Sequence, residues 1–369
     1  MSMSEVFYTT MRCKLGDSLL KKLSRLITAA GIDKINFHDR FCAIKIHFGE
    51  PGNLAFLRPN FAKTVSDHIK KLGGRPFLTD CGTLYVGRRT HALAHLEAAY
   101  ENGFSPLSTG CQVLIADGLR GTDDVEVPVP SGQAVKSAFI GRAIMDADIV
   151  VSLNHFKGHE LTGFGGAIKN LGMGSGSRGG KMVMHNDGKP SVEPNLCTGC
   201  KTCSKFCAQA AFTFKTKKAH IDHRKCVGCG RCLGACSFHA ITNSWDSANS
   251  TLNCKIVEYA LAVVQDRPNF HINIINQVSP FCDCHEENDA AVVPDLGMYA
   301  SFDPVALDLA SIEAVNKAAG LANSILAERV QDGSDLFTSI HPTTNWREQI
   351  DHAVKVGLGQ NKYRLVEVK

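Results

Sequence analysis

The chain has 369 residues, enough for two or three domains, and 44% of them are hydrophobic while 21% are charged. This mixture is typical of globular proteins and excludes disorder, collagen and coiled coil as the main class. The formal net charge of only +4 gives no indication of nucleic-acid binding. No apolar run approaches the roughly 20 residues of a membrane helix, and residues 1–12 show no secretory signal. We therefore expect a cytoplasmic protein without a membrane segment.

Strands and helices are predicted to alternate along most of the chain. Asp303 followed by Pro304 is typical of a helix start, since Asp is a good N-cap and Pro fits the first turn. In chain order, the patterns predict a strand at 41–48, a helix at 59–72, a strand at 76–79, a helix at 88–101, strands at 112–116 and 148–153, a helix at 251–265, a strand at 272–278, and helices at 303–318 and 346–356. Such alternation predicts the α/β class, with a mostly parallel sheet and helices on both faces. The expected host domain comprises 1–189 and 248–369, and a small α+β insert at 190–247 interrupts it.

Eight of the 15 cysteines lie in two runs inside this insert. Each run has the spacing C-x2-C-x2-C-x3-C, which is typical of bacterial proteins with two [4Fe–4S] clusters. Two-residue gaps let one tight loop present three thiolates to one cluster, and the fourth cysteine of each run ligates the other cluster. We expect one cluster on Cys197, Cys200, Cys203 and Cys236, and the second on Cys226, Cys229, Cys232 and Cys207. Two zinc sites are the alternative, and the repeated triplet favours iron and sulfide.

The insert is also basic, with eight Lys or Arg against three Asp or Glu between 190 and 247. A hairpin is expected between 211–215 and 219–222. The lysines are either ordinary surface residues or a docking face for an acidic electron donor or acceptor, such as a ferredoxin or a flavodoxin. The residues after the fourth cysteines, Ala208 and Ser237, depart from the proline that usually stands there.

Polar side chains follow five predicted strands of the host. In open α/β sheets, ligands bind beyond the carboxyl ends of the strands, so we expect one shared site there rather than separate caps and surface groups. Histidine suits proton transfer near neutral pH, and lysines suit a small anionic substrate. The strand-end groups are Lys45, His47 and Glu50, then Asp80 and Cys81, then Asp117, then the runs 154–160 and 282–287. The candidate catalytic residues are His155, Lys157, His159, Lys169 and Asp283.

A glycine-rich stretch at 163–181 has eight glycines in 19 residues. It matches neither the phosphate-binding loop with a final Lys-Ser/Thr nor the dinucleotide fingerprint. It is interpreted either as a flexible lid or as a cradle for a carboxylate or phosphate. In the second case Lys157, Lys169 and Arg178 are the counter-charges.

The segment Cys282-Asp283-Cys284-His285 is a candidate third metal or redox site. On an extended chain, residues i and i+2 point the same way, so Cys282 and Cys284 could share one metal. A histidine from 155, 159 or 185 could complete that site. The alternatives are two buried or free thiols and a catalytic dithiol.

Several stretches of the host resemble the family known as domain of unknown function 362. They are residues 45–50, 146–154, 157–170, 282–285 and 301–308, and the most specific are the Lys157-Gly-His159 to Lys169-Asn170 block and the 282–285 segment. Members of that family often carry an inserted ferredoxin segment, so the resemblance implies an iron–sulfur protein without naming a substrate. The family's core is also similar to the N-terminal part of nickel-dependent lactate racemase, which is a likeness of fold alone.

Three functional hypotheses remain open at this point. In the first, the chain is an iron–sulfur oxidoreductase whose two clusters relay electrons to the strand-end site. In the second, it is an electron carrier without chemistry of its own, which docks to a partner enzyme. In the third, it delivers a metal or a cluster held by Cys282 and Cys284. The first accounts best for the host, because a carrier needs only the ~60 residues of the insert.

Overall fold

A computed structural model describes residues 3–85, 87–185, 190–207, 209–226, 231–242, 249–329 and 335–369. Cys229 and Ala208, on which the sequence makes predictions, lie outside these ranges.

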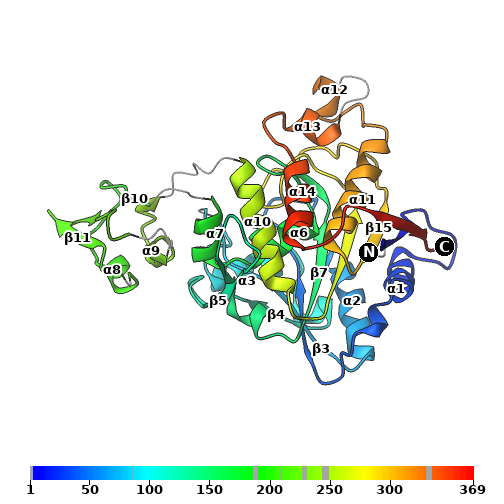
Figure 1. The fold of residues 1–369 in the computed structure, drawn as a ribbon, viewed down its shortest axis with the longest axis horizontal. Helices are drawn as coiled ribbons and strands as arrows, with labels where there is room; N and C mark the ends of the chain where they lie inside the picture. The colour runs from blue at the N-terminus through cyan, green and yellow to red at the C-terminus, as the bar shows by residue number, and fades with distance from the viewer. Residues whose placement is uncertain are drawn as a thin grey trace.

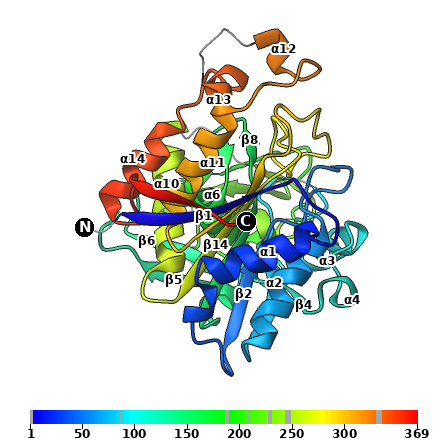
Figure 2. The same ribbon diagram turned by 90° about the vertical axis from the view of Figure 1, so that its right-hand side faces the viewer.

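A central sheet of eight strands has the spatial order β16-β1-β15-β14-β7-β2-β3-β4. β15 is antiparallel to both of its neighbours, and all the other neighbouring pairs are parallel. The first and last strands lie side by side, because β1 pairs with β16, and since this pair is parallel the two termini lie at opposite ends of it (Figure 1 and Figure 2). The strands are β1 (Ser4–Thr10), β2 (Phe41–Lys45), β3 (Arg75–Asp80), β4 (Gln112–Ile115), β7 (Ile149–His155), β14 (Asn269–Ile275), β15 (Gly297–Ser301) and β16 (Tyr363–Glu367). The expectation of a mostly parallel α/β sheet is confirmed.

Helices cover both faces of this sheet, as predicted. Strand β7 shows the reason: Val151 and Leu153 belong to one apolar core, whereas Val150 belongs to the other. Side chains alternate along a strand, so a strand buried on both faces reads as a continuous apolar run. One face carries α1 (Leu19–Ala29), α2 (Pro59–Lys71) and α3 (Ala92–Glu101), and the other carries α6 (Ala167–Ser175), α10 (Asn249–Val264), α11 (Pro304–Lys317) and α14 (Arg347–Val356).

Helix starts follow the capping residues. The predicted start after Asp303 is confirmed, since its side chain accepts hydrogen bonds from the backbone N–H groups of Val305 and Ala306. The prediction of a helix from residue 88 is wrong, because α3 begins only at Ala92, where the His91 ring caps the N–H of Ala94. Arg89 is thereby left in the preceding loop, and its carbonyl oxygen accepts from the N–H of Thr83.

The glycine-rich stretch is not the loop that the sequence suggested. It forms the short strand β9 (Gly163–Gly165), paired with β8 (Lys157–His159), then α6, and then α7 (Arg178–His185). Its glycines allow close packing of backbones: a Cβ on Gly172 would strike the carbonyl of Ile256 in α10, and one on Gly180 would strike the carbonyl of Phe139. The interpretation as a flexible lid is therefore wrong, because these residues are buried between helices.

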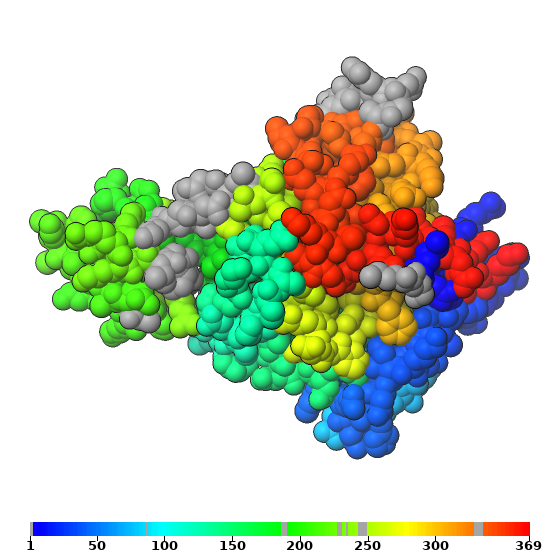
Figure 3. Space-filling model, viewed as in Figure 1, coloured from blue at the N-terminus to red at the C-terminus, as the bar shows by residue number. Residues whose placement is uncertain are grey.

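Residues 190–242 form a small lobe that projects from the α/β body (Figure 1 and Figure 3). Its apolar cluster is separate from those of the body, and half of the buried residues in it are cysteines: Cys197, Cys203, Ala219, Cys232, Ala240 and Ile241. Its elements are β10 (Ser191–Val192) with β13 (Ile241–Thr242), β11 (Phe212–Lys215) with β12 (Lys218–Ile221), α8 (Thr202–Lys205) and α9 (Arg231–Ala235).

The remaining described elements are short. They are η1 (Ile32–Lys34), α4 (Pro106–Thr109), the hairpin of β5 (Asp124–Pro128) and β6 (Ser137–Gly141), α5 (Arg142–Met145), α12 (Leu326–Arg329) and α13 (Leu336–Ile340). Among the described residues, no helix has both the length and the apolar character to cross a bilayer.

Candidate functional site

A cavity of about 450 Å³ lies beyond the carboxyl ends of β2, β3, β7 and β14. Part of its wall is apolar and is formed by Leu84, Leu153, Leu161, Met173, Leu252 and Ile256. The rest is polar and carries four cationic side chains, Arg89, Lys157, Lys169 and Lys181. A pocket with an apolar wall and a few convergent charges is the usual form of a small-molecule site.

A buried carboxylate fixes two of the predicted residues. Asp283 Oδ1 lies 2.8 Å from Nδ1 of His155, and its Oδ2 accepts from Nζ of Lys157, also at 2.8 Å. The other ring nitrogen of His155 donates to the carbonyl of Asn276 at 2.9 Å. Burial alone would raise the pKa of Asp283, but the charges of His155 and Lys157 outweigh it and lower that pKa. Asp283 is therefore ionised behind the cavity wall and holds Lys157 in place.

Cys282 and Cys284 come together through a turn, not through an extended chain as the sequence suggested. The N–H of His285 donates to the carbonyl of Cys282 at 3.1 Å, which closes the turn. The reason is Asp283, whose buried ion pairs draw the middle of the segment inward. Cys282 and Cys284 both line the cavity.

The surroundings favour a thiolate on Cys282. A hydrogen bond from Cys284 lowers the pKa of Cys282 well below its usual value, and Lys169 and His159 add to this effect against the cost of burial. Lys169 Nζ lies 3.4 Å from Cys282 Sγ. The same pairing raises the pKa of Cys284, so one proton is shared by the two sulfurs.

The tautomer of His159 follows from its backbone contacts. Its Nδ1 accepts from the N–H groups of Leu161 and Thr162, at 3.1 and 3.2 Å. Nε2 is consequently the ring nitrogen that carries hydrogen, and it lies 3.6 Å from Oε1 of Glu160. His159 thus presents a donor to the anionic groups of the cavity.

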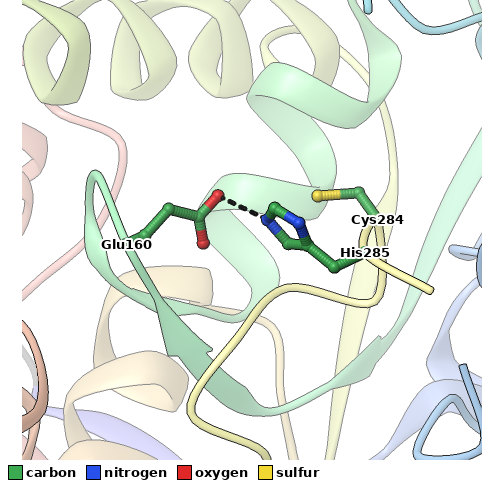
Figure 4. A group of neighbouring side chains, drawn as sticks. All are labelled: Glu160, Cys284 and His285. Atoms are coloured by element: carbon green, nitrogen blue, oxygen red, sulfur yellow. Dashed lines mark hydrogen bonds and ion pairs between the residues drawn. The ribbon is translucent and has the colours of Figure 1, made fainter. Parts of the chain in front are cut away.

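Glu160 and His285 form a second pair at the cavity wall. Glu160 Oε1 lies 3.1 Å from Nε2 of His285. Burial would raise the pKa of Glu160, but the neighbouring His159 ring and the bond from His285 bring it down to about 2. The same hydrogen bond raises the pKa of His285. Figure 4 shows the carboxylate directed at the imidazole ring, with the thiol of Cys284 beside it.

A further ion-pair network underlies the cavity at the ends of β2 and β3. Lys45 Nζ lies 2.8 Å from Asp80 and donates to Oδ1 of Asn170 at 2.6 Å. Arg89 Nε donates to Glu50 at 2.8 Å, and its Nη1 lies 2.9 Å from Nε2 of His47. The strand-end residues that the sequence singled out here are therefore in mutual contact.

The cysteine runs surround two hollows of the lobe. One is lined by Cys197, Cys200, Cys203 and Cys236, and the other, of about 140 Å³, by Cys207, Cys226 and Cys232. Backbone N–H groups point at several of the sulfurs: that of Ala219 at Cys197 (3.3 Å), that of Ala211 at Cys207 (3.4 Å) and that of Ala240 at Cys236 (3.3 Å). Such N–H···S bonds are the kind that tune iron–sulfur centres.

The second hollow lies between the lobe and the body. Asp124, Phe139 and Gly179 of the body line it together with the lobe cysteines, and Arg231 of the lobe pairs with Asp124 at 3.1 Å. Helix α7 connects this hollow with the large cavity, because Gly179 lines the first while Lys181 and His185 line the second. Gly179 and Lys181 are two residues apart, or about 3 Å of helix rise.

The structure brings most of the candidate residues of the host to one place. Those in the cavity wall are His155, Lys157, His159, Lys169, Cys282, Cys284 and His285, with Asp283 directly behind. Arg178 does not line the cavity. The sequence missed Arg89 and Lys181, and it assigned no role to Glu160. A break in apolar periodicity at residues 88–91 was the only signal for Arg89.

Comparison with known proteins identifies one family and two proteins that are similar to short stretches of this chain. The family described as "Domain of unknown function (DUF362)" matches residues 42–313. A protein of Halobacterium salinarum, provisionally named as the iron–sulfur subunit of a dimethyl sulfoxide reductase, is 32% identical over 74 residues, which are 19% of this chain and 26% of that protein. A component of the ion-translocating oxidoreductase complex of Methanosarcina acetivorans is 42% identical over 45 residues, 12% of this chain and 17% of that protein. The chain thus spans about a quarter or less of the length of these relatives.

Among solved structures, the lactate racemase apoprotein of Thermoanaerobacterium thermosaccharolyticum is similar with a TM-score of 0.42 and 12% identity. That likeness covers 86% of this chain and 58% of the racemase. A protein from Thermotoga maritima follows with a TM-score of 0.39, also at 12% identity, over 78% of this chain and 55% of that one.

Proposed function

The chain belongs to the family described as domain of unknown function 362, and from that premise we propose that it is an iron–sulfur protein that passes electrons from two [4Fe–4S] clusters to a small anionic substrate in the cavity. When bound, the clusters supply single electrons. The observation that carries the proposal is helix α7, which lines both the cavity and the hollow around Cys207, Cys226 and Cys232.

The donor set of the lobe supports the assignment of two clusters. Four sulfurs face one hollow and three face the other, in the combination that the exchange of fourth cysteines predicts. Cys229, the remaining predicted ligand, lies outside the described residues. The short matches to proteins of iron–sulfur and oxidoreductase complexes point to the same chemistry. The lobe, 190–247, is accordingly proposed as a two-cluster insert in the host domain.

The charges of the cavity support an anionic substrate. Arg89 is balanced by Glu50, Lys157 by Asp283, and Lys169 by the thiolate of Cys282. Lys181 Nζ donates to the carbonyl of Gly176 at 2.6 Å; its charge acts on the buried Asp117, but no carboxylate oxygen of the described residues lies within ion-pair distance of it. A bound carboxylate or phosphate would supply a negative charge for the ammonium group of Lys181, while the apolar wall would hold the rest of the substrate.

Two of the predicted residues can serve the reduction of a substrate. His159 presents Nε2–H to the cavity, and Lys169 presents its ammonium group beside Cys282. Lys169 can donate a proton to a substrate that gains electrons, and the Nε2–H of His159 can stabilise the developing negative charge by a hydrogen bond. Asp283 lies behind the cavity wall, and both ring nitrogens of His155 are bonded, to Asp283 and to the carbonyl of Asn276, so their proposed role is to orient Lys157.

The electron partner is proposed to be an acidic carrier protein. Lys201, Lys205, Lys215 and Lys217 of the lobe lie on its exposed surface. Complementary charge raises the rate of encounter and aligns the partners. A ferredoxin or a flavodoxin has the required chemistry.

The test follows the clusters by their visible absorption. Protein reduced with dithionite and freed from excess reductant is mixed with 2-oxo acids and 2-enoic acids, small carboxylates with a reducible bond. We expect at least one class to reoxidise the clusters at a rate that saturates with its concentration. Lys169→Gln should lower that rate at least tenfold, whereas Lys63→Gln, at an exposed site on α2, should leave it unchanged.

Two results would contradict the proposal. Reoxidation that never saturates and is equally fast in Lys169→Gln would show that the cavity does not bind the acceptor. Reduction of an acidic flavodoxin, with none of the small acids reacting, would instead identify an electron carrier without its own chemistry.

A further inference from the structure

Three side chains in the cavity wall have no part in the electron path described above. Glu160 follows strand β8, whereas Cys284 and His285 lie in the turn after β14. One ligand atom of each, a carboxylate oxygen, a thiol sulfur and a ring nitrogen, lies within 4.8 Å of the other two. Figure 4 shows the three side chains converging from the two segments.

The contacts of these groups leave one of them unsatisfied. Glu160 Oε1 is taken by His285, but Oε2 is buried and has no hydrogen-bond partner among the described residues. A buried carboxylate oxygen without a donor is costly. The unpartnered Oε2 therefore favours a ligand that brings positive charge to it.

The backbone on both sides of the group is held firmly. The turn is closed by the bond from His285 N–H to Cys282, and the carbonyl of His285 accepts from Nδ2 of Asn53 at 3.0 Å. The N–H of Glu50 donates to the carbonyl of Asp283 at 2.8 Å. On the other side, the backbone bonds to His159 fix the segment that carries Glu160. A preformed arrangement of this kind favours a ligand that needs defined geometry.

We propose that Glu160, Cys284 and His285 bind one divalent metal ion of the zinc class at the wall of the cavity. Sulfur, nitrogen and oxygen donors together suit zinc and similar borderline ions, and hard ions such as calcium and magnesium prefer oxygen alone. The metal replaces the hydrogen bond between Glu160 and His285 and takes up the free Oε2, and its binding displaces the thiol proton of Cys284 and the proton on Nε2 of His285.

The ligand set leaves one coordination position for an exchangeable group. Cys282, another possible donor in the cavity wall, has its sulfur 3.4 Å from the ammonium group of Lys169 and is paired with that cation instead. Three protein ligands and an open position are typical of catalytic zinc sites, in contrast to closed structural sites. The open position faces the cavity, so the anionic group of the substrate binds there; this last step rests on the proposed function, whereas the metal site itself does not.

The experiment measures zinc in the anaerobic holoprotein. After equilibrium dialysis against Zn²⁺, we expect one zinc per chain in addition to the cluster iron. Glu160→Gln, which keeps the shape of the side chain, and His285→Ala should each weaken zinc binding at least tenfold. The control Cys13→Ser removes an exposed thiol of the body and should change nothing. Iron and sulfide content should be the same in all of these proteins.

Zinc-edge X-ray absorption then identifies the ligands. We expect one sulfur neighbour at about 2.3 Å together with nitrogen and oxygen neighbours at about 2.0–2.2 Å. Four sulfur neighbours would place the zinc at the cluster cysteines and would overturn the proposal, as would zinc binding that is unaffected by Glu160→Gln. If the variants lose zinc binding but keep the rate of cluster reoxidation, the metal site stands and only its role in binding the substrate is contradicted. If the protein binds zinc but none of the small acids reoxidises the clusters, only the proposed function is contradicted.

Discussion

The α/β body and the cysteine lobe differ in what fills their interiors. The body has two apolar cores on the faces of an eight-stranded sheet, and it also buries an ion-paired network around Asp80 and Asp283. Among the described residues of the lobe, the buried apolar cluster has six members, and three of these are cysteines. A unit of this size rarely folds on its apolar core alone. We therefore expect the body to supply its own stability and to tolerate a polar cavity, and we expect the stability of the lobe to depend on what its cysteines bind.

Removal of iron is expected to have the largest effect, and it should act on the lobe and not on the body. If iron is removed with ferricyanide and a chelator, the lobe should unfold while the body stays folded, because ligand binding and folding are coupled in small metal-binding units. Hydrogen exchange followed by mass spectrometry should show the amides of β11 and β12 exchanging at the shortest labelling time. Those of β7 and β14 should remain protected. Protection of β11 and β12 after iron removal would contradict this dependence.

The second prediction concerns the body alone. Asp283→Asn leaves Lys157 and His155 buried without their carboxylate, and breaking a buried ion pair from one side costs about 3–5 kcal/mol. Guanidinium unfolding followed by circular dichroism should show this loss. Asp123→Asn, which removes an exposed pair with Arg142, should cost less than about 1 kcal/mol. Similar losses in the two variants would mean that the Asp283 network does not support the body.

The same network explains which parts of the site could be predicted from the sequence. Residues at the carboxyl ends of parallel strands must meet at one edge, so the approach of His47, His155 and Cys282 to one cavity followed from the order of strands and polar residues. The turn at Cys282 did not, because it depends on ion pairs of Asp283 with residues more than 120 positions away.

Two other features escaped sequence analysis for related reasons. Arg89 reads as part of a helix, yet it is drawn into the cavity wall by Glu50 and His47, which lie about 40 positions away. The glycines at 172 and 180 read as a loop, since helix propensity penalises glycine. They nevertheless lie in helices α6 and α7, and glycine is needed there because these helices approach other backbones too closely for a side chain. In each case a tertiary contact outweighs the local preference.

The third prediction concerns a smaller change in the free energy of unfolding, which depends on pH. Burial raises the pKa of Asp308 to about 6, above its ordinary 3.8, and this side chain accepts from the N–H groups of Ala167 and Ile168 at the start of α6. The Asp308 carboxyl group is therefore protonated more often in the folded protein than in the unfolded chain between about pH 4 and pH 6, so its contribution to the free energy of unfolding falls as pH rises through this window. The fall contributed by Asp308 is at most about 3 kcal/mol.

Unfolding midpoints measured across this window test the prediction. The free energy of unfolding of Asp308→Asn should rise relative to that of the unaltered protein as pH increases from about 4 to about 6, and that of Asp123→Asn should show no such relative change. A slope of opposite sign, with the body gaining stability between pH 4 and pH 6 because of Asp308, would show that this carboxyl group is ionised more easily in the folded protein.

We propose that the lobe holds two clusters, one of them beside the helix that lines the cavity. The iron and acid-labile sulfide contents of anaerobically purified protein and of the variant Cys207→Ser test this proposal. We expect about eight iron and eight sulfide per chain in the unaltered protein, since each cubane contains four of each. The variant should lose only the iron and sulfide of the second hollow. Zinc without sulfide, or a single cluster's worth of iron in the unaltered protein, would contradict the account.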